Sequence, residues 1–300
     1  MAANGSSTPS VCHWPKLGNE LTYRRIVVIS GISIIVSSTT LQRPSRVPAD
    51  PVRPPLPDHL PTPAAPTTGF DGWFFLRLAF IFALLGCFSF AIDHAASVGF
   101  ATPPHVVWPL KGDLRKLVAL SEVFGHGTGV LLVILAVFAI DLPNRWKTGI
   151  LLTTAFGGGL MANVVKICSV ARYRPHAFDF SNSIWDSFQQ WAPILSWTVN
   201  EELQKASLQS FPSAHAATAA GLCVGLCYFY PHARWFFVML MSLAGLQRVV
   251  FGMHFPSDVL FGAAVGLVTA TLLLTHGGLP SLVEKIERRI RSTHPTSGVA

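Results

Sequence analysis

Apolar residues gather in six stretches of the chain, and short polar segments separate one stretch from the next. A helix that crosses a bilayer needs about 20 predominantly apolar residues. The pattern therefore predicts an all-α fold, namely a polytopic membrane protein with a six-transmembrane-helix bundle. The predicted helices cover residues 74–92, 127–140 (extended at its start by Val123 and Phe124), 148–170, 212–230, 235–250 and 257–275.

The flanks of this bundle have a different character. Residues 26–36 form an apolar run too short for a span, which resembles a signal-peptide core without an Ala-x-Ala-like cleavage site. The proline-dense residues 41–68 predict an extended, disordered linker. We therefore assign residues 1–68 to a poorly ordered extension and residues 69–276 to the six-helix domain. Residues 277–300 form a basic amphipathic tail that would lie on an anionic membrane surface.

Three features within the bundle depart from plain apolar sequence. Residues 93–121 predict an amphipathic connection between the first two spans, and the polar residues up to 210 form a loop that suits a lid or an interfacial surface. Residues 157–159 are three consecutive glycines inside a predicted helix. Glycine weakens a helix, so we expect these positions to allow close helix–helix approach.

Composition supports the membrane class and excludes others. Half of the 300 residues are hydrophobic and 12% are charged, about half the charged fraction of a soluble domain. The net charge of +7 is not a signal for nucleic-acid binding, because excess Lys and Arg in such proteins mostly set orientation. None of the five cysteines forms a Cys-x-x-Cys pair, so neither a disulfide framework nor a thiolate zinc site is indicated. The composition says nothing of oligomeric state.

The basic residues also predict an orientation in the membrane. Six spans place both ends of the bundle on one side, together with the basic segments at 141–147 and 231–234. The positive-inside rule makes that side cytoplasmic. The opposite ends of the helices, with their unusual polar residues, then face the outside, which is the periplasm if the protein resides in a bacterial inner membrane.

Charged residues concentrate at those outer helix ends. The segment between the last two spans carries Arg248, His254 and Asp258. A charged residue at the edge of a bilayer is costly and marks a functional site by default. A plainer interpretation is a snorkelling arginine, a hydrogen-bonded histidine and a helix-capping aspartate.

The charges at the other outer helix ends favour a site for an anion. Lys166, Arg174 and Arg248 must share an anion or repel one another, and arginine matches phosphate oxygens well. Ser210 is expected to cap the helix that holds Ser213, and the free backbone N–H groups of its first turn would also bind phosphate. No cluster of carboxylates that a magnesium site would need is present in the sequence pattern.

Two histidines and an aspartate at these helix ends can carry out the acid–base and nucleophilic steps of phosphoryl transfer. His215, at the positive end of its helix, can protonate a leaving oxygen. Asp258 follows His254 by four residues and can accept its ring N–H, which raises the nucleophilicity of the other ring nitrogen.

With these motifs, the sequence resembles the type 2 phosphatidic acid phosphatase superfamily over about residues 70–276. The family motifs are Lys-x6-Arg-Pro, Pro-Ser-Gly-His and Ser-Arg-x5-His-x3-Asp. Here they read Lys166-x7-Arg174-Pro175, Pro212-Ser213-Ala214-His215 and Gln247-Arg248-x5-His254-x3-Asp258.

The resemblance implies a role for each motif residue. It implies that His254 is the nucleophile that forms a phosphohistidine, that His215 is the general acid and that Asp258 orients His254. It further implies that Lys166, Arg174, Ser213 and Arg248 bind phosphate, in a reaction that needs no metal and no cofactor.

Three positions depart from the family pattern. Ala214 replaces glycine but keeps a backbone N–H, and Gln247 replaces serine beside Arg248. Lys166 lies one residue further from Arg-Pro than in the family, which would turn it by about 100° around a regular helix. Either the helix absorbs the extra residue as a π-bulge or a loosened last turn, or Arg172 supplies the charge instead of Lys166.

The sequence therefore predicts an integral membrane phosphatase that acts on a lipid phosphate or pyrophosphate of the phosphatidate, undecaprenyl pyrophosphate or lipid A type. Its partners would be the lipid bilayer and the lipid phosphate substrate. Two alternatives stay open: a lipid phosphotransferase on the same fold, and a non-catalytic membrane scaffold or transporter. Retention of both His254 and His215 together with Asp258 argues against the last.

Overall fold

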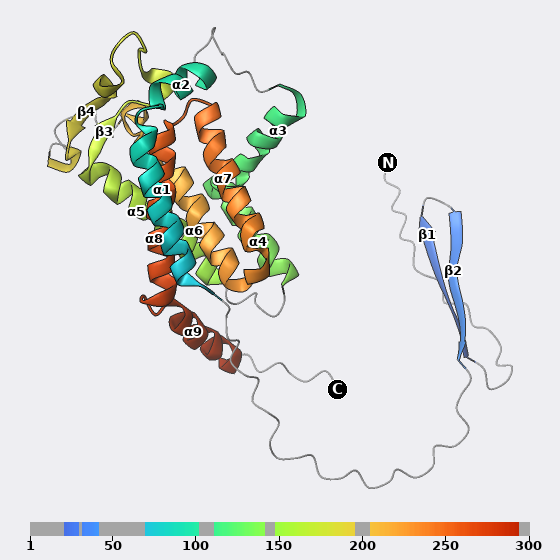
Figure 1. Ribbon diagram of the computed structural model, residues 1–300. Coiled ribbons are helices and arrows are strands. Elements are labelled where there is room, and N and C mark those ends of the chain that lie inside the picture. Colours follow the sequence, from blue (N-terminus) through green and yellow to red (C-terminus); the bar gives the residue numbers. More distant parts are fainter. Residues whose placement is uncertain are drawn as a thin grey trace, which may run out of the picture. The chain divides into compact units, whose positions relative to one another are not determined.

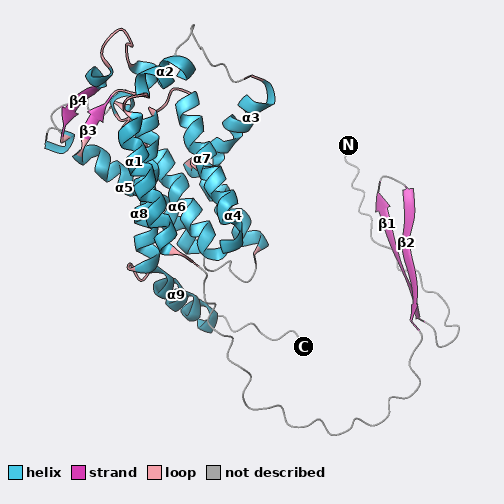
Figure 2. Cartoon of the chain, in the orientation of Figure 1, coloured by secondary structure: helices cyan, strands magenta, loops and turns pink. Residues whose placement is uncertain are grey.

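The computed structural model describes residues 21–29, 32–41, 70–101, 111–141, 148–195 and 205–293, the first two segments by their backbone alone. The chain divides into two units, residues 1–65 and 66–300, and each is described by itself. The second unit is mostly helical, and its described strands are two short segments at one end (Figure 2).

The described part of the first unit is a β-hairpin. Strand β1 (Leu21–Ile29) pairs antiparallel with β2 (Ile32–Leu41), with an irregular register between Arg25 and Ile26. The sequence did not predict this hairpin, and the poor order expected of residues 1–68 stays a prediction. The apolar run at 26–36 is rich in β-branched residues on both sides of a Ser-Gly pair, a composition that favours a hairpin over a signal-like helix. The proline-dense linker lies outside the described residues.

The second unit contains a helix at each of the six predicted places (Figure 1). Their bounds are α1 Gly72–Ser89, α4 Gly127–Ile140, α5 Thr148–Cys168, α6 Ala214–Phe229, α7 Arg234–Val250 and α8 Pro256–Thr275.

The predicted count of six spans is not confirmed. Within the part of the chain that is described, four helices are long and apolar enough to cross a membrane: α1, α5, α8, and α7 together with the turn before it. A fifth span results if α4 is joined to the preceding Gly112–Phe124, from which it is bent by 75°. Helix α6 is apolar but has 16 residues, because Ser213 caps its start and Pro231 follows soon after its end. The chain is therefore an integral membrane protein with four or five candidate spans.

Helix α6 is the centre of the bundle. All twelve residues from Ala216 to Cys227 are buried, with α5, α7 and α8 packed around them. A Cβ at Gly221 would collide with the Thr154 carbonyl of α5, and one at Gly158 of α5 would lie 2.7 Å from the Ala217 carbonyl of α6. The expected close approach at residues 157–159 is thus present, and it joins α5 to α6 almost backbone to backbone.

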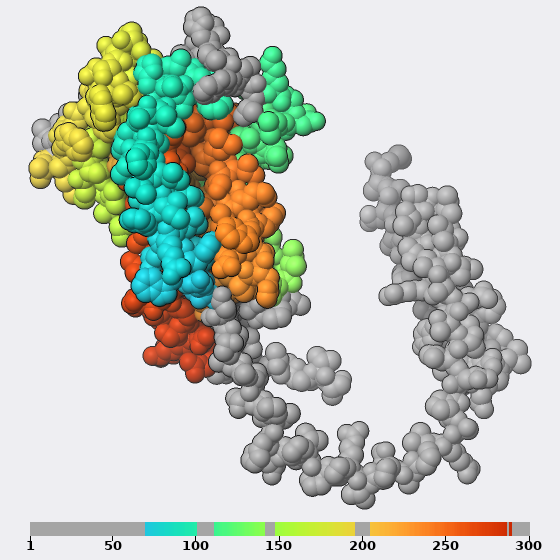
Figure 3. All heavy atoms as spheres, viewed as in Figure 1, coloured from blue at the N-terminus to red at the C-terminus, as the bar shows by residue number. Residues whose placement is uncertain are grey.

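The remaining helices enclose this centre. Helix α1 packs along α8, and its Phe74 ring lies 5.5 Å from the ring of Trp235 on α7. Figure 3 shows α1 and α7 side by side on one face of the unit. Helix α9 (Leu279–Thr293) follows α8, at the end of this unit opposite its own two short strands (Figure 1). It is the amphipathic tail helix predicted above, with Val283 packed on the core and Leu282 and Ile286 exposed.

Short elements cover the end of the bundle at which α5 and α7 finish and α6 and α8 begin (Figure 1). The predicted amphipathic connection forms helices α2 (Asp93–Ala101) and α3 (Gly112–Leu120) and the 3-10 turn η1 (Ser121–Phe124). In the described part of the predicted lid loop, β4 (Phe188–Trp191) pairs with β3 (Val170–Arg172), which follows α5, and 3-10 turns lie around this two-stranded sheet. This end of the bundle holds the polar residues that the sequence singled out.

Candidate active site

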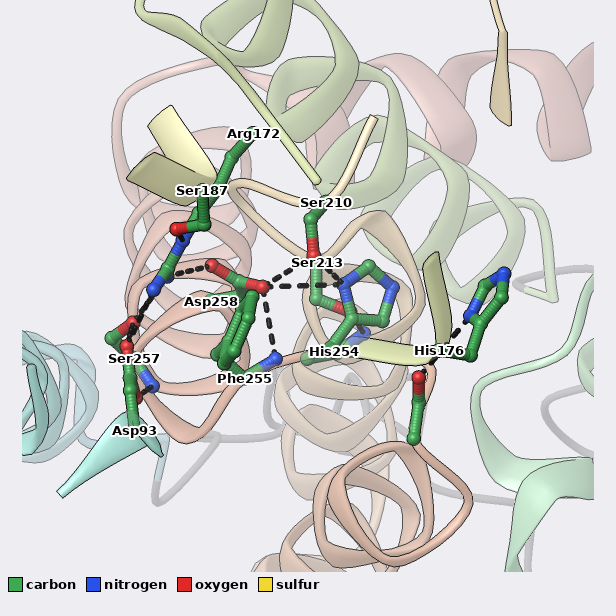
Figure 4. A network of polar contacts seen from close by, with 12 residues as sticks. Asp93, Arg172, His176, Ser187, Ser210, Ser213, His254, Phe255, Ser257 and Asp258 are labelled. Carbon is green, nitrogen blue, oxygen red and sulfur yellow. Dashed lines mark hydrogen bonds and ion pairs between the residues drawn. The ribbon is translucent and has the colours of Figure 1, made fainter. Parts of the chain in front are cut away.

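His254 and Asp258 lie together where the chain passes from α7 into α8. The side chains are almost fully buried, and His254 Nδ1 is 3.8 Å from Asp258 Oδ2, too far for a direct hydrogen bond. Ser210 fills the gap: its hydroxyl donates to Asp258 Oδ2 at 2.5 Å and lies 3.4 Å from His254 Nδ1 (Figure 4). Asp258 thus faces His254 as predicted, with Ser210 between the two groups.

The position of Ser210 corrects one prediction. Ser210 does not cap α6; the cap is Ser213, whose hydroxyl oxygen accepts from the Ala216 N–H at 3.3 Å. Ser210 instead lies in the loop before the helix, where its N–H donates to the Arg172 carbonyl. The sequence offered two serines three residues apart in front of an apolar run, and either fits a helix start. The contact with Asp258 that distinguishes them spans 48 residues of sequence.

Two of the predicted phosphate ligands surround the imidazole of His254. Lys166, at the end of α5, is buried, and its charge and that of Arg174 act on the ring. Burial is the main reason that the pKa of His254 falls to about 4; the nearby Asp258 opposes this shift, and the two cations reinforce it. The imidazole is therefore neutral near pH 7, the form in which a ring nitrogen can act as a nucleophile.

Three buried nitrogen atoms at the site lack a hydrogen-bond partner among the described residues. They are Arg174 Nε, Arg248 Nε and His215 Nε2. Arg174 interacts electrostatically with Arg248, and burial beside that second cation lowers its pKa. Buried donors without partners are rare in folded proteins. Two guanidinium groups and a histidine with unpaired nitrogens are the donors expected of a site for an anion with several oxygens, and this group of residues is called the anion site below.

His215 is held in the first turn of α6 by close packing. A Cβ on Gly125 would lie 2.7 Å from His215 Nε2, so the ring rests directly against the backbone after η1. The backbone of Glu122 lies near the ring, and the centroid of the His126 ring is 6.2 Å away. A glycine at position 125 therefore allows the approach that places His215 beside the anion site.

The extra residue between Lys166 and Arg174 is accommodated by the end of a helix. Ser169 N–H donates to the Val165 carbonyl at 2.8 Å, and from Val170 the chain runs as strand β3. The i to i−4 ladder thus ends before Tyr173, as expected for a loosened last turn, and no π-bulge is involved. Lys166 keeps its place near His254 in this arrangement.

Arg172 does not supply charge to the anion site. Its side chain is fully buried and forms ion pairs with Asp258 Oδ1 at 2.6 Å and Asp93 Oδ2 at 2.8 Å (Figure 4). Its guanidinium also lies over the rings of Phe255 and Phe188, at 4.0 and 4.4 Å from their centroids. With both carboxylates engaged, Arg172 is a structural partner of Asp258 rather than a phosphate ligand.

Sequence reasoning missed Asp93 and Glu122. Asp93 was placed in an amphipathic connection, yet its side chain is fully buried at the start of α2. Glu122 Oε1 accepts from Arg248 Nη1 at 2.8 Å, and its Oε2 lies 3.3 Å from the amide nitrogen of Gln247, the residue that replaces the family's serine. A carboxylate directly after an apolar run, as at position 93, was a usable signal. Glu122 gave no such signal, because it follows a stretch of ordinary surface charges.

Among the described residues, no three His, Cys, Asp or Glu side chains come close enough together to hold a metal ion. The polar groups of the site are instead donors and cations suited to an oxyanion.

Comparison with known proteins gives a consistent result. The profile of the PAP2 superfamily matches residues 146–277. The decaprenylphosphoryl-5-phosphoribose phosphatase of Mycobacterium tuberculosis is 39% identical over 172 residues, which are 56% of this chain and 82% of that protein. The lipid A 1-phosphatase of Rhizobium etli is 30% identical over 122 residues, 40% of this chain and 46% of that protein.

A solved structure is also similar. The PAP2-type phosphatidylglycerolphosphate phosphatase of Bacillus subtilis has a TM-score of 0.39 and 23% identity, over 73% of this chain and 94% of that one. The chain spans less than half the length of the lipid A 1-phosphatases that it matches. The family match includes all seven predicted site residues, from Lys166 to Asp258. From the match to the mycobacterial relative and the family profile, the chain belongs to the PAP2 superfamily.

Proposed function

We propose that this protein is a membrane phosphatase that hydrolyses a phosphate monoester or pyrophosphate on a lipid through a phosphohistidine. One observation carries the proposal: a neutral, buried His254 lies beside an anion site whose donors Arg174, Arg248 and His215 keep unpaired nitrogens among the described residues. Lys166 and Ser213 complete the phosphate-binding set. The site would face the outside of the cell, the periplasm in a bacterial inner membrane.

The first half of the reaction transfers the phosphoryl group to the protein. The lone pair of His254 Nε2 attacks phosphorus, and the bond from phosphorus to the lipid oxygen breaks. His215 gives its proton to that oxygen, so the lipid leaves as an alcohol or, from a pyrophosphate, as a monophosphate. Arg174, Arg248 and Lys166 stabilise the charge on the transferring oxygens.

The second half regenerates the free histidine. A water molecule attacks the phosphohistidine, and neutral His215 accepts one of its protons. The phosphorus–nitrogen bond breaks, its electrons return to His254, and inorganic phosphate leaves. Asp258, through Ser210, holds the Nδ1 proton in place, so that Nε2 is the nitrogen that reacts.

A cavity beside His215 supports a lipid as the substrate. Its volume is about 810 Å³, and it lies between α5 and α6 with His215 and Gly125 at one end. Leu152, Phe156 and Leu160 give most of it an apolar wall. A hydrocarbon chain in this cavity would place the phosphate at its head next to the general acid.

The distribution of charge supports an outward-facing site. The anion site lies at one end of the bundle, and the basic helix α9 lies at the other (Figure 1). By the positive-inside rule the α9 end is cytoplasmic. A single cysteine at Ser181 should react with an impermeant maleimide in intact cells, and one at Ser281 should react only after permeabilisation. The reverse pattern would place the site in the cytoplasm.

The activity is tested with purified protein in detergent and a panel of phosphatidate, prenyl mono- and pyrophosphates and lipid A. Phosphate release in the presence of EDTA, inhibited by vanadate, is the expected result. Rapid quenching should trap a phosphoprotein that is stable in alkali and labile in acid, and His254→Ala should not form it. Loss of activity in EDTA with rescue by magnesium would overturn the mechanism. Transfer of the phosphoryl group to an added lipid alcohol in place of water would identify a phosphotransferase.

A further inference from the structure

Asp258 belongs to a fully buried network of four polar side chains next to His254, with Asp93, Arg172 and Ser257 as the other three. Asp93 Oδ1 accepts from the Ser257 N–H at 3.0 Å, and Asp93 Oδ2 accepts from the Ser257 hydroxyl at 2.5 Å. Arg172 Nη1 donates to the Ser257 hydroxyl at 2.7 Å, in addition to its ion pairs with Asp93 and Asp258. Figure 4 shows Arg172 between Asp93 on one side and Asp258 on the other.

We propose that Asp93 and Arg172 are positioning residues for catalysis: Asp93 fixes Arg172, and Arg172 fixes the carboxylate that orients the nucleophile. The proposal rests on the phosphatase function proposed above. Asp93 lies outside the region of the chain that matches the family profile, so its role is not implied by the three motifs.

The two oxygens of Asp258 explain what Arg172 does. Oδ1 is taken by Arg172 Nη1, whereas Oδ2 accepts from Ser210 and from the Phe255 N–H at 3.0 Å. Oδ2 is also the oxygen nearer to His254. A carboxylate held at both oxygens cannot rotate, so the Arg172 contact keeps Oδ2 and Ser210 directed at the imidazole.

Arg172 also needs a second partner of its own. Its guanidinium has five N–H donors, and Nη1 alone faces Asp258. Asp93 engages Nη2 and the Ser187 hydroxyl engages Nε, so the plane of the guanidinium is set from three directions. The rings of Phe255 and Phe188 then hold this plane by stacking.

The net negative charge of the buried network favours the phosphohistidine intermediate. Two carboxylates and one guanidinium leave an excess negative charge next to His254. When phosphorus bonds to Nε2, the ring keeps its Nδ1 proton and becomes cationic. A carboxylate that is fixed and ionised next to that proton stabilises the cation more than it stabilises the neutral ring before transfer. Arg172 and Asp93 therefore act on the chemical step, not on the binding of phosphate.

The test compares Asp93→Asn and Arg172→Gln, singly and together, with Tyr230→Phe as control. Tyr230 donates to Asp141 at 2.6 Å at the opposite end of the bundle, so its loss perturbs a partly buried polar contact without reaching the site. For each variant, kcat, KM and the inhibition constant of inorganic phosphate are measured with the best substrate of the panel, and Tm is measured in detergent.

We expect kcat to fall about 100-fold for each single variant, within the usual range for disturbed acid–base machinery, while KM and product inhibition by inorganic phosphate change less than about threefold. Because Asp93 acts through Arg172, the double variant should be no worse than Arg172→Gln alone. Additive losses, or a rise of KM and of the phosphate inhibition constant in step with the fall of kcat, would overturn the proposal.

A second pair of variants keeps the test decisive if Arg172→Gln does not fold. Arg172→Lys keeps the charge but cannot bond Asp93 and Asp258 at once, and Ser257→Ala removes the hydroxyl between them. Both should lower kcat by about tenfold at unchanged KM, and unchanged kcat in both would overturn the proposal. Absence of activity in the unsubstituted protein would instead refute the proposed function, whatever the variants do.

Discussion

Arg172 and Arg174 are two residues apart, yet they belong to regions with opposite charge balance. Arg172 is enclosed by two carboxylates and two aromatic rings and has no exposed surface. Arg174 keeps a buried Nε without a partner in the described chain and lies near a second cation, Arg248. Carboxylates of the protein neutralise the guanidinium of Arg172, whereas the charge of Arg174 can interact with a ligand.

The comparison extends to the whole site. On the Arg172 side, the carboxylates of Asp93 and Asp258 outnumber the one guanidinium. On the Arg174 side are three cations, Lys166, Arg174 and Arg248, of which Arg248 pairs with the carboxylate of Glu122. His254 is adjacent to both regions. We call the negatively charged region of Arg172, Asp93 and Asp258 the rear, and the positively charged region of Arg174, Arg248 and Lys166 the front. A phosphate dianion fits the front, and the cationic ring formed on transfer fits the rear. Substitutions can separate these two regions, since one governs phosphate affinity and the other the chemical step.

The largest loss of activity should follow substitution of the two histidines, His254 and His215. His254→Ala should abolish turnover and phosphoenzyme formation, whereas His215→Ala should cost about 10²–10⁴-fold in kcat as the loss of a general acid. A substrate with a nitrophenolate leaving group, which needs no proton, should recover most of the His215→Ala loss. Equal losses with both types of substrate would contradict the assignment of His215.

The front should control phosphate affinity. Arg174→Ala and Lys166→Ala should each weaken vanadate binding about 10- to 100-fold, because a charge-assisted contact to an anion contributes about 1.5–3 kcal/mol. Inhibition by vanadate at several substrate concentrations measures this effect. Arg172→Lys should lower kcat and leave product inhibition by inorganic phosphate nearly unchanged. A larger loss of phosphate inhibition in Arg172→Lys than in Lys166→Ala would move the phosphate contact from Lys166 to Arg172.

The pH dependence tests the front and the rear together. His254 has a pKa of about 4 in the folded protein and about 6.5 when unfolded. The nucleophile is thus neutral above about pH 4, and the acid limb of kcat/KM from this group should lie near pH 4 rather than 6.5. Arg174→Gln removes a cation that lowers this pKa, so the limb should shift to higher pH. A limb that does not move would show that Arg174 is not near the nucleophile in solution.

The same shift has a consequence for stability. Between pH 6.5 and about 4 the unfolded chain binds the proton on His254 more readily than the folded chain does. The contribution of His254 to the free energy of unfolding is therefore full above pH 6.5 and declines as the pH falls towards 4. Thermal unfolding in detergent should show a steeper loss of Tm over this range for the wild type than for His254→Asn. Equal slopes would be inconsistent with a buried neutral imidazole.

The smallest effect should come from Glu122. Its side chain is 41% exposed and pairs with Arg248, so it competes weakly with a bound anion for Nη1. Glu122→Gln should tighten vanadate binding by about two- to fivefold at low salt, with less change at 0.5 M salt, because exposed charges are screened. Weaker binding in this variant would mean that Glu122 mainly positions Arg248.

The sequence predicted the parts of this site that follow from local pattern. Helices α5 and α8, which carry Lys166 and Asp258, begin and end within two residues of the predicted spans. Long apolar runs allow few other interpretations, so they define helices well. The placement of polar residues at one end of the bundle followed from the number and order of those runs. Lys166 was predicted to lie near His254 because a lysine without a partner near the end of an apolar helix is energetically costly.

The features of the site that the sequence did not predict depend on contacts between segments far apart in the chain. Asp93 meets Ser257 across 164 positions, and Ser210 meets Asp258 across 48. Neither contact leaves a periodic trace in the sequence. The hairpin of β1 and β2 was missed for a different reason: a short apolar run is compatible with a strand and with a helix, and length alone favoured neither.

The contact of α5, α6 and α8 through their backbones sets limits on how such an enzyme can diversify. Gly158 and Gly266 both face the Ala217 carbonyl so closely that a side chain on either would force the helices apart. Variation at these positions would displace the ends of the helices that carry Lys166, His215 and Asp258. Inherited changes in substrate range should therefore accumulate at exposed positions of η1, α2 and residues 176–195, which lie at the same end of the bundle as the site. A directed-evolution library confined to those segments should yield more active variants than one of equal size drawn from the three helices.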